Sequence, residues 1–119
     1  MGELVVMIIR HAEKPLTPDP PHGVSIDGLA DQDSLTPRGW QRAGALVGLF
    51  SGERNGLLRK PTHLFASRVV PESGSRRSFE TLQPLSERLG LSIDTRFAKN
   101  ELAELAAAVG ATSGVVLIA

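Results

Sequence analysis

The chain has 119 residues, of which 41% are hydrophobic and 22% charged, so we expect residues 1–119 to form one globular domain. Basic and acidic residues number 13 each, and this balance favours neither nucleic acid nor a membrane surface as a partner. The lack of cysteine excludes disulfides, thiolate metal sites and cysteine nucleophiles, and it fits a cytoplasmic protein. No stretch approaches the ~18 apolar residues of a membrane span, and no secretory signal is recognisable at the start.

The first predicted element is a strand over residues 4–9. Its six apolar residues run without interruption and are too few for an ordinary helix, a pattern typical of a strand buried on both faces in a parallel sheet. Arg10 and His11 follow directly. Because ligands bind just beyond the carboxyl ends of strands in open α/β sheets, we expect this cation and this titratable nucleophile to lie at a pocket.

A loop and a helix come next. Residues 15–35 are rich in proline, glycine and aspartate and are predicted to be irregular, either as a pocket wall or lid or as a plain mobile loop. Thr36 suits a helix N-cap and Pro37 the first helical position, and Ser51 and Gly52 end the pattern. The apolar face of this helix is formed by Trp40, Ala43, Val47 and Phe50, with Trp40 expected in the core.

The remaining elements alternate between strand and helix. They are a strand at 61–67, a helix at 75–89 that ends at Gly90, a short strand at 91–93, a helix at 100–109 and a buried strand at 114–119. Pro84 is expected to kink or split the first of these helices. In the second, Leu102, Leu105 and Val109 should face inward. The alternation predicts an α/β fold with a largely parallel sheet.

Three segments together resemble one protein family. Residues 10–13 (Arg-His-Ala-Glu) follow a strand, residues 35–43 (Leu-Thr-Pro-Arg-Gly-Trp-Gln-Arg-Ala) open a helix, and Arg77 precedes Thr81 by four residues. These segments are similar to the Arg-His-Gly/Ala signature, the "LTxxGxxQA" helix start and the Arg-Ala-x-Gln-Thr-Ala segment of the histidine phosphatase superfamily. Glu80 stands where that family has Gln, and Arg68 stands where it has Pro.

The second arginine of the family pattern is either Arg76 or Arg77, and spacing favours Arg77. At the first turn of a helix, free backbone N–H groups and the helix dipole already favour an anion. An arginine there presents a planar fork that matches two phosphate oxygens. We therefore expect Arg77 to bind a phosphoryl group.

The resemblance implies a three-layer α/β/α fold of the phosphoglycerate mutase-like type and hydrolysis of a small-molecule phosphate ester, without metal or other cofactor. His11 would attack phosphorus and become phosphohistidine, and Arg10 and Arg77 would bind the phosphoryl oxygens. The family's general acid corresponds best to Glu101. Glu104 and Glu13 are the alternatives.

The family's second catalytic histidine follows a later strand, which corresponds to residues 114–119 here, and neither His22 nor His63 replaces it. We expect either a C-terminally truncated domain or a degenerate member, with exposed sheet edges that favour self-association. Besides a phosphatase, the sequence is compatible with a catalytically impaired phosphate-ligand binding module or a phosphoglycerate mutase-like phosphotransferase.

Overall fold

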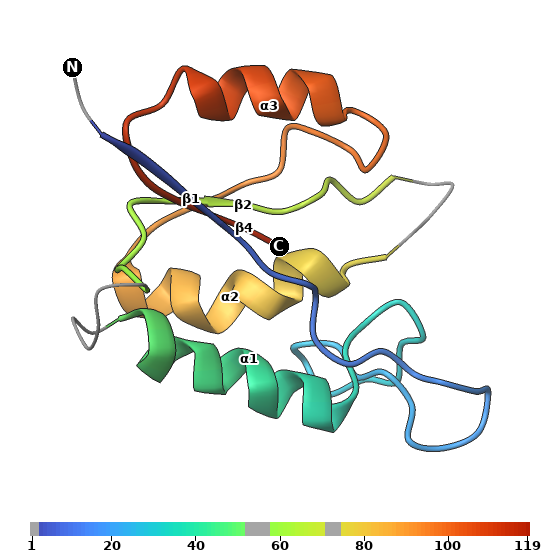
Figure 1. The fold of residues 1–119 in the computed structure, drawn as a ribbon. Coiled ribbons are helices and arrows are strands. Elements are labelled where there is room, and N and C mark those ends of the chain that lie inside the picture. Colours follow the sequence, from blue (N-terminus) through green and yellow to red (C-terminus); the bar gives the residue numbers. More distant parts are fainter. Residues whose placement is uncertain (1–2, 52–57, 71–74) are drawn as a thin grey trace.

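The computed structural model describes residues 3–51, 58–70 and 75–119, which form a parallel four-stranded sheet flanked by helices (Figure 1). The strands are β1 (Leu4–Ile8), β2 (His63–Phe65), β3 (Ile93–Asp94) and β4 (Gly114–Ile118). Their order across the sheet is β1-β4-β2-β3, so the first and last strands of the sequence are neighbours. The α/β fold and the parallel sheet are as predicted.

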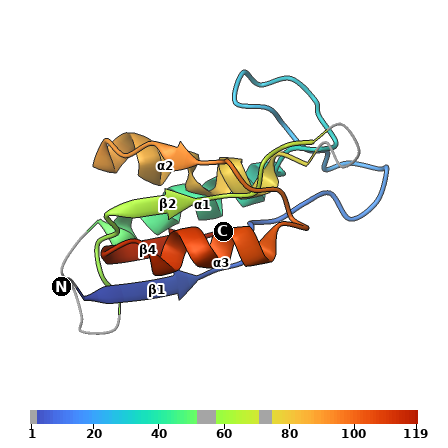
Figure 2. The ribbon, with the colours of Figure 1, turned by 90° about the horizontal axis from the view of Figure 1, so that it is seen from above.

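The helices cover both faces of the sheet. Helices α1 (Pro37–Phe50) and α2 (Arg77–Leu89) lie on one side and α3 (Leu102–Gly110) on the other, where it lies over β4 (Figures 1 and 2). Successive strand residues point to opposite faces, so Leu64 and Leu117 pack with α1 and α2 while their neighbours Phe65 and Val116 pack with α3. This alternation produces three layers.

Strand β1 lies at an edge of the sheet and pairs, among the described residues, with β4 alone. Val6 and Ile8 are 42% and 75% exposed, so the prediction that this strand is buried on both faces is wrong. A continuous apolar run does not distinguish a central strand from an edge strand whose outer side is uncovered. Self-association through such an edge stays a prediction.

Helix α1 begins and ends as its sequence predicts. The Thr36 hydroxyl accepts a hydrogen bond from the Gly39 N–H at 3.1 Å, Pro37 is the first helical residue, and Ser51 is the C-cap. The predicted stop at Gly52 lies outside the described residues. Trp40 packs against the buried cluster of Ala12, Leu35 and Ala43, which confirms its place in the core.

Helix α2 runs without a break from Arg77 to Leu89, so of the two predicted effects of Pro84, a kink or a split, the split does not occur. Leu82 and Leu85 flank the proline and are fully buried in the main core, and this packing holds both halves in one helix. Gly90 caps the helix with a left-handed φ of 68°, as its sequence position predicts.

The C-terminal elements differ from their predicted bounds by one or two residues. In α3, Leu105 and Val109 pack on the sheet as expected, but Leu102 is 67% exposed. Periodicity identifies the apolar face of a helix and not how much of that face the sheet covers. No helix of the described ranges is long and apolar enough to cross a membrane.

Candidate functional site

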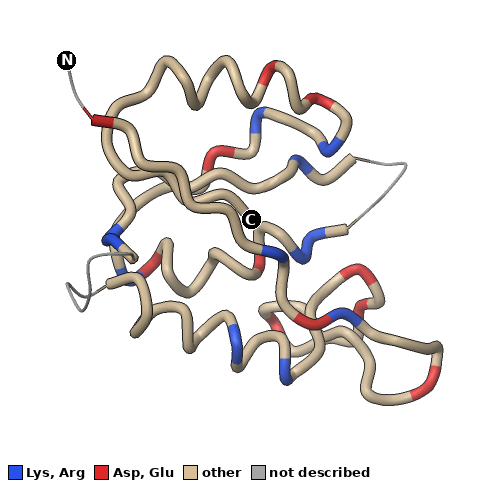
Figure 3. The backbone as a smooth tube through the Cα atoms, viewed as in Figure 1, with Lys and Arg blue, Asp and Glu red and all other residues tan. Residues whose placement is uncertain are grey.

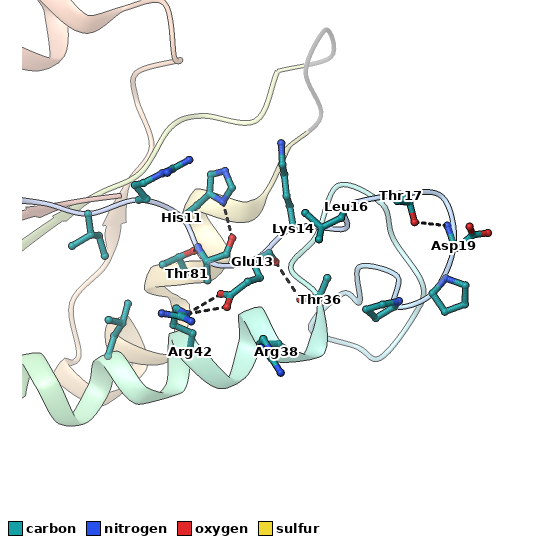
Figure 4. Close-up of a pocket in the computed structure, with 16 residues that line it drawn as sticks. His11, Glu13, Lys14, Leu16, Thr17, Asp19, Thr36, Arg38, Arg42 and Thr81 are labelled. Carbon is teal, nitrogen blue, oxygen red and sulfur yellow. Dashed lines mark hydrogen bonds and ion pairs between the residues drawn. The ribbon is translucent and has the colours of Figure 1, made fainter.

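A pocket of about 980 Å³ opens beyond the carboxyl end of β1 (Figure 4). The long loop projects from this end of the sheet (Figure 2). Three segments line the pocket, namely residues 9–14, loop residues between 16 and 21, and one face of α1 from its cap at Thr36 to Leu46. Thr81 of α2 also lines the pocket. Arg10 and His11 both line this pocket. The predicted location beyond a parallel strand therefore does contain a pocket.

The loop of residues 15–35 divides into two parts. Its first part forms a wall of the pocket through Leu16, Thr17, Asp19, Pro20 and Pro21. Its second part is fastened by backbone hydrogen bonds from the Val24 N–H to the Leu35 carbonyl and from the Asp31 N–H to the Gly23 carbonyl, both at 2.8 Å. A Cβ at Gly23 would lie 2.0 Å from the Asp31 carbonyl oxygen, so only glycine fits there. The loop thus serves as a pocket wall, one of the two predicted alternatives.

The imidazole of His11 is oriented by the backbone of the next residue, Ala12. Its Nδ1 lies 2.7 Å from the carbonyl oxygen of Ala12. A carbonyl oxygen only accepts hydrogen bonds, so Nδ1 carries the proton and donates it. In the neutral ring, Nε2 then holds the lone pair. His11 is half-buried and stands at the pocket with that lone pair available for a nucleophilic attack.

The segment that follows His11 is held from two sides. The buried Ala12 donates its N–H to the Thr81 hydroxyl of α2 at 2.9 Å. One residue later, the carbonyl of Glu13 accepts a hydrogen bond from the N–H of Thr36, the N-cap of α1, at 3.0 Å. Two helices therefore fix the backbone on which the His11 side chain depends.

The close contact between this segment and α1 requires a glycine. A Cβ at Gly39 would lie 2.5 Å from the Glu13 carbonyl oxygen, whereas one at Gly44 meets no atom within 4 Å. We expect Gly39→Ala to lower the free energy of unfolding by about 1–3 kcal/mol through this overlap. Gly44→Ala is the control and should raise it by roughly 0.5–1 kcal/mol, because alanine favours helix over glycine. Chemical denaturation measures both, and equal effects of the two variants would contradict the contact.

The pocket carries an excess of positive charge. Arg10, Lys14, Arg38 and Arg42 line it against the carboxylates of Glu13 and Asp19. Figure 3 shows residues of both signs gathered where the loop meets the start of α1. Within the described residues, Arg42 alone of these four cations makes an ion pair, with Glu13 at 2.9 Å. The unpaired cations make the pocket suitable for an anion.

Glu13 is an ionised partner and not a poised acid. The hydrogen bond from the Arg42 guanidinium is the main cause that lowers the pKa of Glu13, and the nearby charges of Arg42 and Arg38 act in the same direction. A carboxyl group with a lowered pKa carries no proton at neutral pH. Glu13, an alternative acid from the sequence, therefore has none to give in this arrangement.

Arg77 lies one helical turn before Thr81, at the predicted first turn of α2, but its side chain does not line the pocket. The guanidinium donates to the backbone carbonyl of Gln32 and, at 3.4 Å, to the Ser75 hydroxyl. Its Nε is buried and has no hydrogen-bond partner within the part of the chain that is described. The other candidate, Arg76, forms an ion pair with Asp31.

Glu101 also lies apart from the pocket. It occupies the N-cap position of α3, where its carboxylate accepts the Ala98 N–H at 2.9 Å and pairs with Arg68 at 3.1 Å. Glu104 is exposed in the first turn of the same helix. Of the four predicted site residues, the structure thus brings Arg10 and His11 together, and it places Arg77 and Glu101 outside the pocket lining.

Sequence reasoning missed several polar residues of the pocket, namely Lys14, Thr36, Arg38, Arg42 and Thr81. Arg38 and Arg42 are four residues apart in a helix that starts where the loop ends, and this spacing puts both on one face. That pattern was sufficient to identify them. The spacing of Thr81 from Arg77 matches the family pattern, but the contact of Thr81 with Ala12 spans 69 residues and has no local signal.

A scan against models of protein families found no family that matches the chain, and a search of curated proteins found no match either. The likeness to histidine phosphatases therefore rests on the motifs of residues 10–13, 35–43 and 77–81, and membership of that superfamily stays a prediction.

Proposed function

We propose that the chain hydrolyses phosphate monoesters through a phosphohistidine on His11, in the manner of the histidine phosphatases that its motifs resemble. One observation carries this proposal: the 2.7 Å hydrogen bond of Nδ1 to the Ala12 carbonyl leaves the lone pair on Nε2, in a pocket where three of the four lining cations make no ion pair with any described residue. The location of the pocket at the carboxyl end of β1 supports the same conclusion.

The reaction has two steps. In the first, the lone pair of Nε2 forms a bond to phosphorus as the bond from phosphorus to the ester oxygen breaks, and the leaving oxygen takes a proton from solvent or an acid. In the second, a water oxygen attacks phosphorus, the P–N bond breaks, and phosphate leaves as the water gives up a proton. Arg10 and Lys14 neutralise charge on the phosphoryl oxygens during both transfers.

Two predicted participants must move to take part. Arg77 would reach a bound phosphoryl group only after it releases the Gln32 carbonyl, and Glu101 only after it leaves Arg68. These contacts favour a second candidate function, a module that binds phosphate esters without turnover. The difference between the two functions is whether His11 takes the phosphoryl group from a bound ester.

The experiment that tests the proposal compares two leaving groups in metal-free buffer. Para-nitrophenolate departs without a proton, whereas the alkoxide of glycerol phosphate requires one. Because the described pocket holds Glu13 ionised, we expect turnover of para-nitrophenyl phosphate to exceed that of glycerol phosphate by at least ~100-fold, the usual value of general acid catalysis. Rapid quenching should trap a phosphoenzyme that is stable to alkali and labile to acid.

The outcomes separate the candidate functions. Turnover together with a trapped phosphoenzyme supports the phosphatase. Saturable binding of both esters without phosphoenzyme supports the binding module and refutes the phosphatase. Equal turnover of the two esters would show an effective general acid, contrary to the ionised state of Glu13. If the chain neither binds nor turns over the esters, both functions are refuted.

A further inference from the structure

We infer that Thr81 is a positioning residue for His11, and that it acts through the peptide groups of Ala12 to keep the imidazole in the tautomer that leaves Nε2 free. Its kinetic consequence rests on the proposed function, whereas its effect on the ring tautomer does not. Thr81 lines the same pocket as His11 and comes from α2, a helix distant in sequence (Figure 4).

The hydroxyl of Thr81 is fully engaged on the backbone. It donates its proton to the Arg77 carbonyl one turn earlier in α2, at 2.7 Å, and it accepts the Ala12 N–H at 2.9 Å. Since its single proton is committed to Arg77, a lone pair must face Ala12. Thr81 is 1% exposed and Ala12 4% exposed, so this hydrogen bond is buried.

The hydrogen bond from the Ala12 N–H to Thr81 controls the Ala12 carbonyl, which is the acceptor for the His11 ring. The Ala12 N–H is fixed by Thr81, and the carbonyl one residue later, on Glu13, is fixed by Thr36. Between these anchors the Ala12 carbonyl points to the His11 ring and accepts its Nδ1–H. Loss of the first anchor frees this carbonyl to turn away, and the ring then has no reason to keep its proton on Nδ1.

Helix α2 makes the anchor rigid. Leu82 follows Thr81 and, with Leu85 one turn on, is fully buried in the main core. The residue before it, Glu80, is 4% exposed and accepts hydrogen bonds from the Ser34 hydroxyl and the Leu35 N–H. The position of the Thr81 hydroxyl is therefore set by the core and transmitted to the pocket.

The test compares three variants by nitrogen-15 spectra of the His11 ring and by kinetics with para-nitrophenyl phosphate. Thr81→Val keeps the shape and loses both hydrogen bonds, whereas Thr81→Ser keeps the hydroxyl. Thr112→Val is the matched control, because its hydroxyl also donates to the carbonyl four residues earlier, that of Ala108 at 2.9 Å, but does not line the pocket. Circular dichroism and chemical denaturation establish that each variant is folded.

We expect the parent, Thr81→Ser and Thr112→Val to show the Nδ1–H tautomer, and Thr81→Val to show the mixed tautomers of an unrestrained imidazole. The kcat of Thr81→Val should fall about 10- to 100-fold with little change in KM, since a displaced nucleophile reacts more slowly without binding less substrate. An unchanged His11 spectrum in folded Thr81→Val overturns the inference, as does a mixed spectrum in Thr112→Val. If the parent is inactive, the phosphatase is refuted, but the spectra still decide the role of Thr81. If Thr81→Val does not fold, the spectrum of folded Thr81→Ser decides instead. Loss of the Nδ1–H tautomer in Thr81→Ser would overturn the inference, and its retention would support it.

Discussion

The His11→Ala variant is expected to form no phosphoenzyme and to lose at least ~10³-fold in turnover of para-nitrophenyl phosphate, as removal of a catalytic nucleophile commonly does. Alanine offers no lone pair to phosphorus. The replacement removes one described hydrogen bond, from Nδ1 to the Ala12 carbonyl, and the half-buried ring at the pocket. The fold should therefore persist, with a loss of roughly 1 kcal/mol in unfolding free energy.

The other two histidines provide the controls. His63 begins β2 at the amino end of the strand, and its Nδ1 lies 2.9 Å from the Thr62 hydroxyl. His22 is exposed in the loop and is not part of the pocket lining. The variants His63→Ala and His22→Ala should keep turnover and phosphoenzyme within about twofold, as surface changes away from a site do. A phosphoenzyme that survives His11→Ala and disappears in either of these would assign the nucleophile elsewhere.

Local chemistry made much of the fold predictable. The cap of Thr36 and Pro37 located the start of α1 to the residue, and Gly90 located the end of α2. The uninterrupted run that stops at Arg10 located a strand whose carboxyl end faces a pocket. In each case the determining groups are neighbours in sequence, so a short window contains the information.

The departures from the sequence pattern share one physical cause, which is competition between groups distant in sequence; the phosphate-binding role of Arg77 and the acid role of Glu101 stay predictions. The pattern around Arg77 suits a phosphate, but the Gln32 carbonyl of a loop 45 residues away already occupies the guanidinium. Glu101 suits an acid, but Arg68 of another loop pairs with it. The apolar run of β1 suits a central strand, yet the arrangement of the sheet places it at an edge. No sequence window contains these partners.

Glu80 shows how such a distant contact supports the pocket, and its loss should have the largest effect on stability. Its carboxylate is 4% exposed and accepts the Ser34 hydroxyl at 2.7 Å and the Leu35 N–H at 2.8 Å, both groups being fully buried. Glu80→Ala leaves these two donors without a partner where water does not reach. We expect a loss of about 2–4 kcal/mol in unfolding free energy, seen as a lower urea midpoint at an unchanged slope.

Two further variants separate the hydrogen bonds from the charge. Glu80→Gln keeps an oxygen for the Leu35 N–H and can turn its amide towards Ser34, so its loss should be about 1 kcal/mol or less. Glu87→Ala removes an exposed carboxylate of the same helix and should change stability by no more than about 0.5 kcal/mol. Should Glu80→Ala resemble Glu87→Ala, the buried carboxylate would not fasten the loop. In Glu80→Ala, Leu35 loses the hydrogen bond of its N–H, and Leu35 directly precedes the Thr36 cap. The hydrogen bond from the Thr36 N–H to the Glu13 carbonyl, near His11, should weaken as a result.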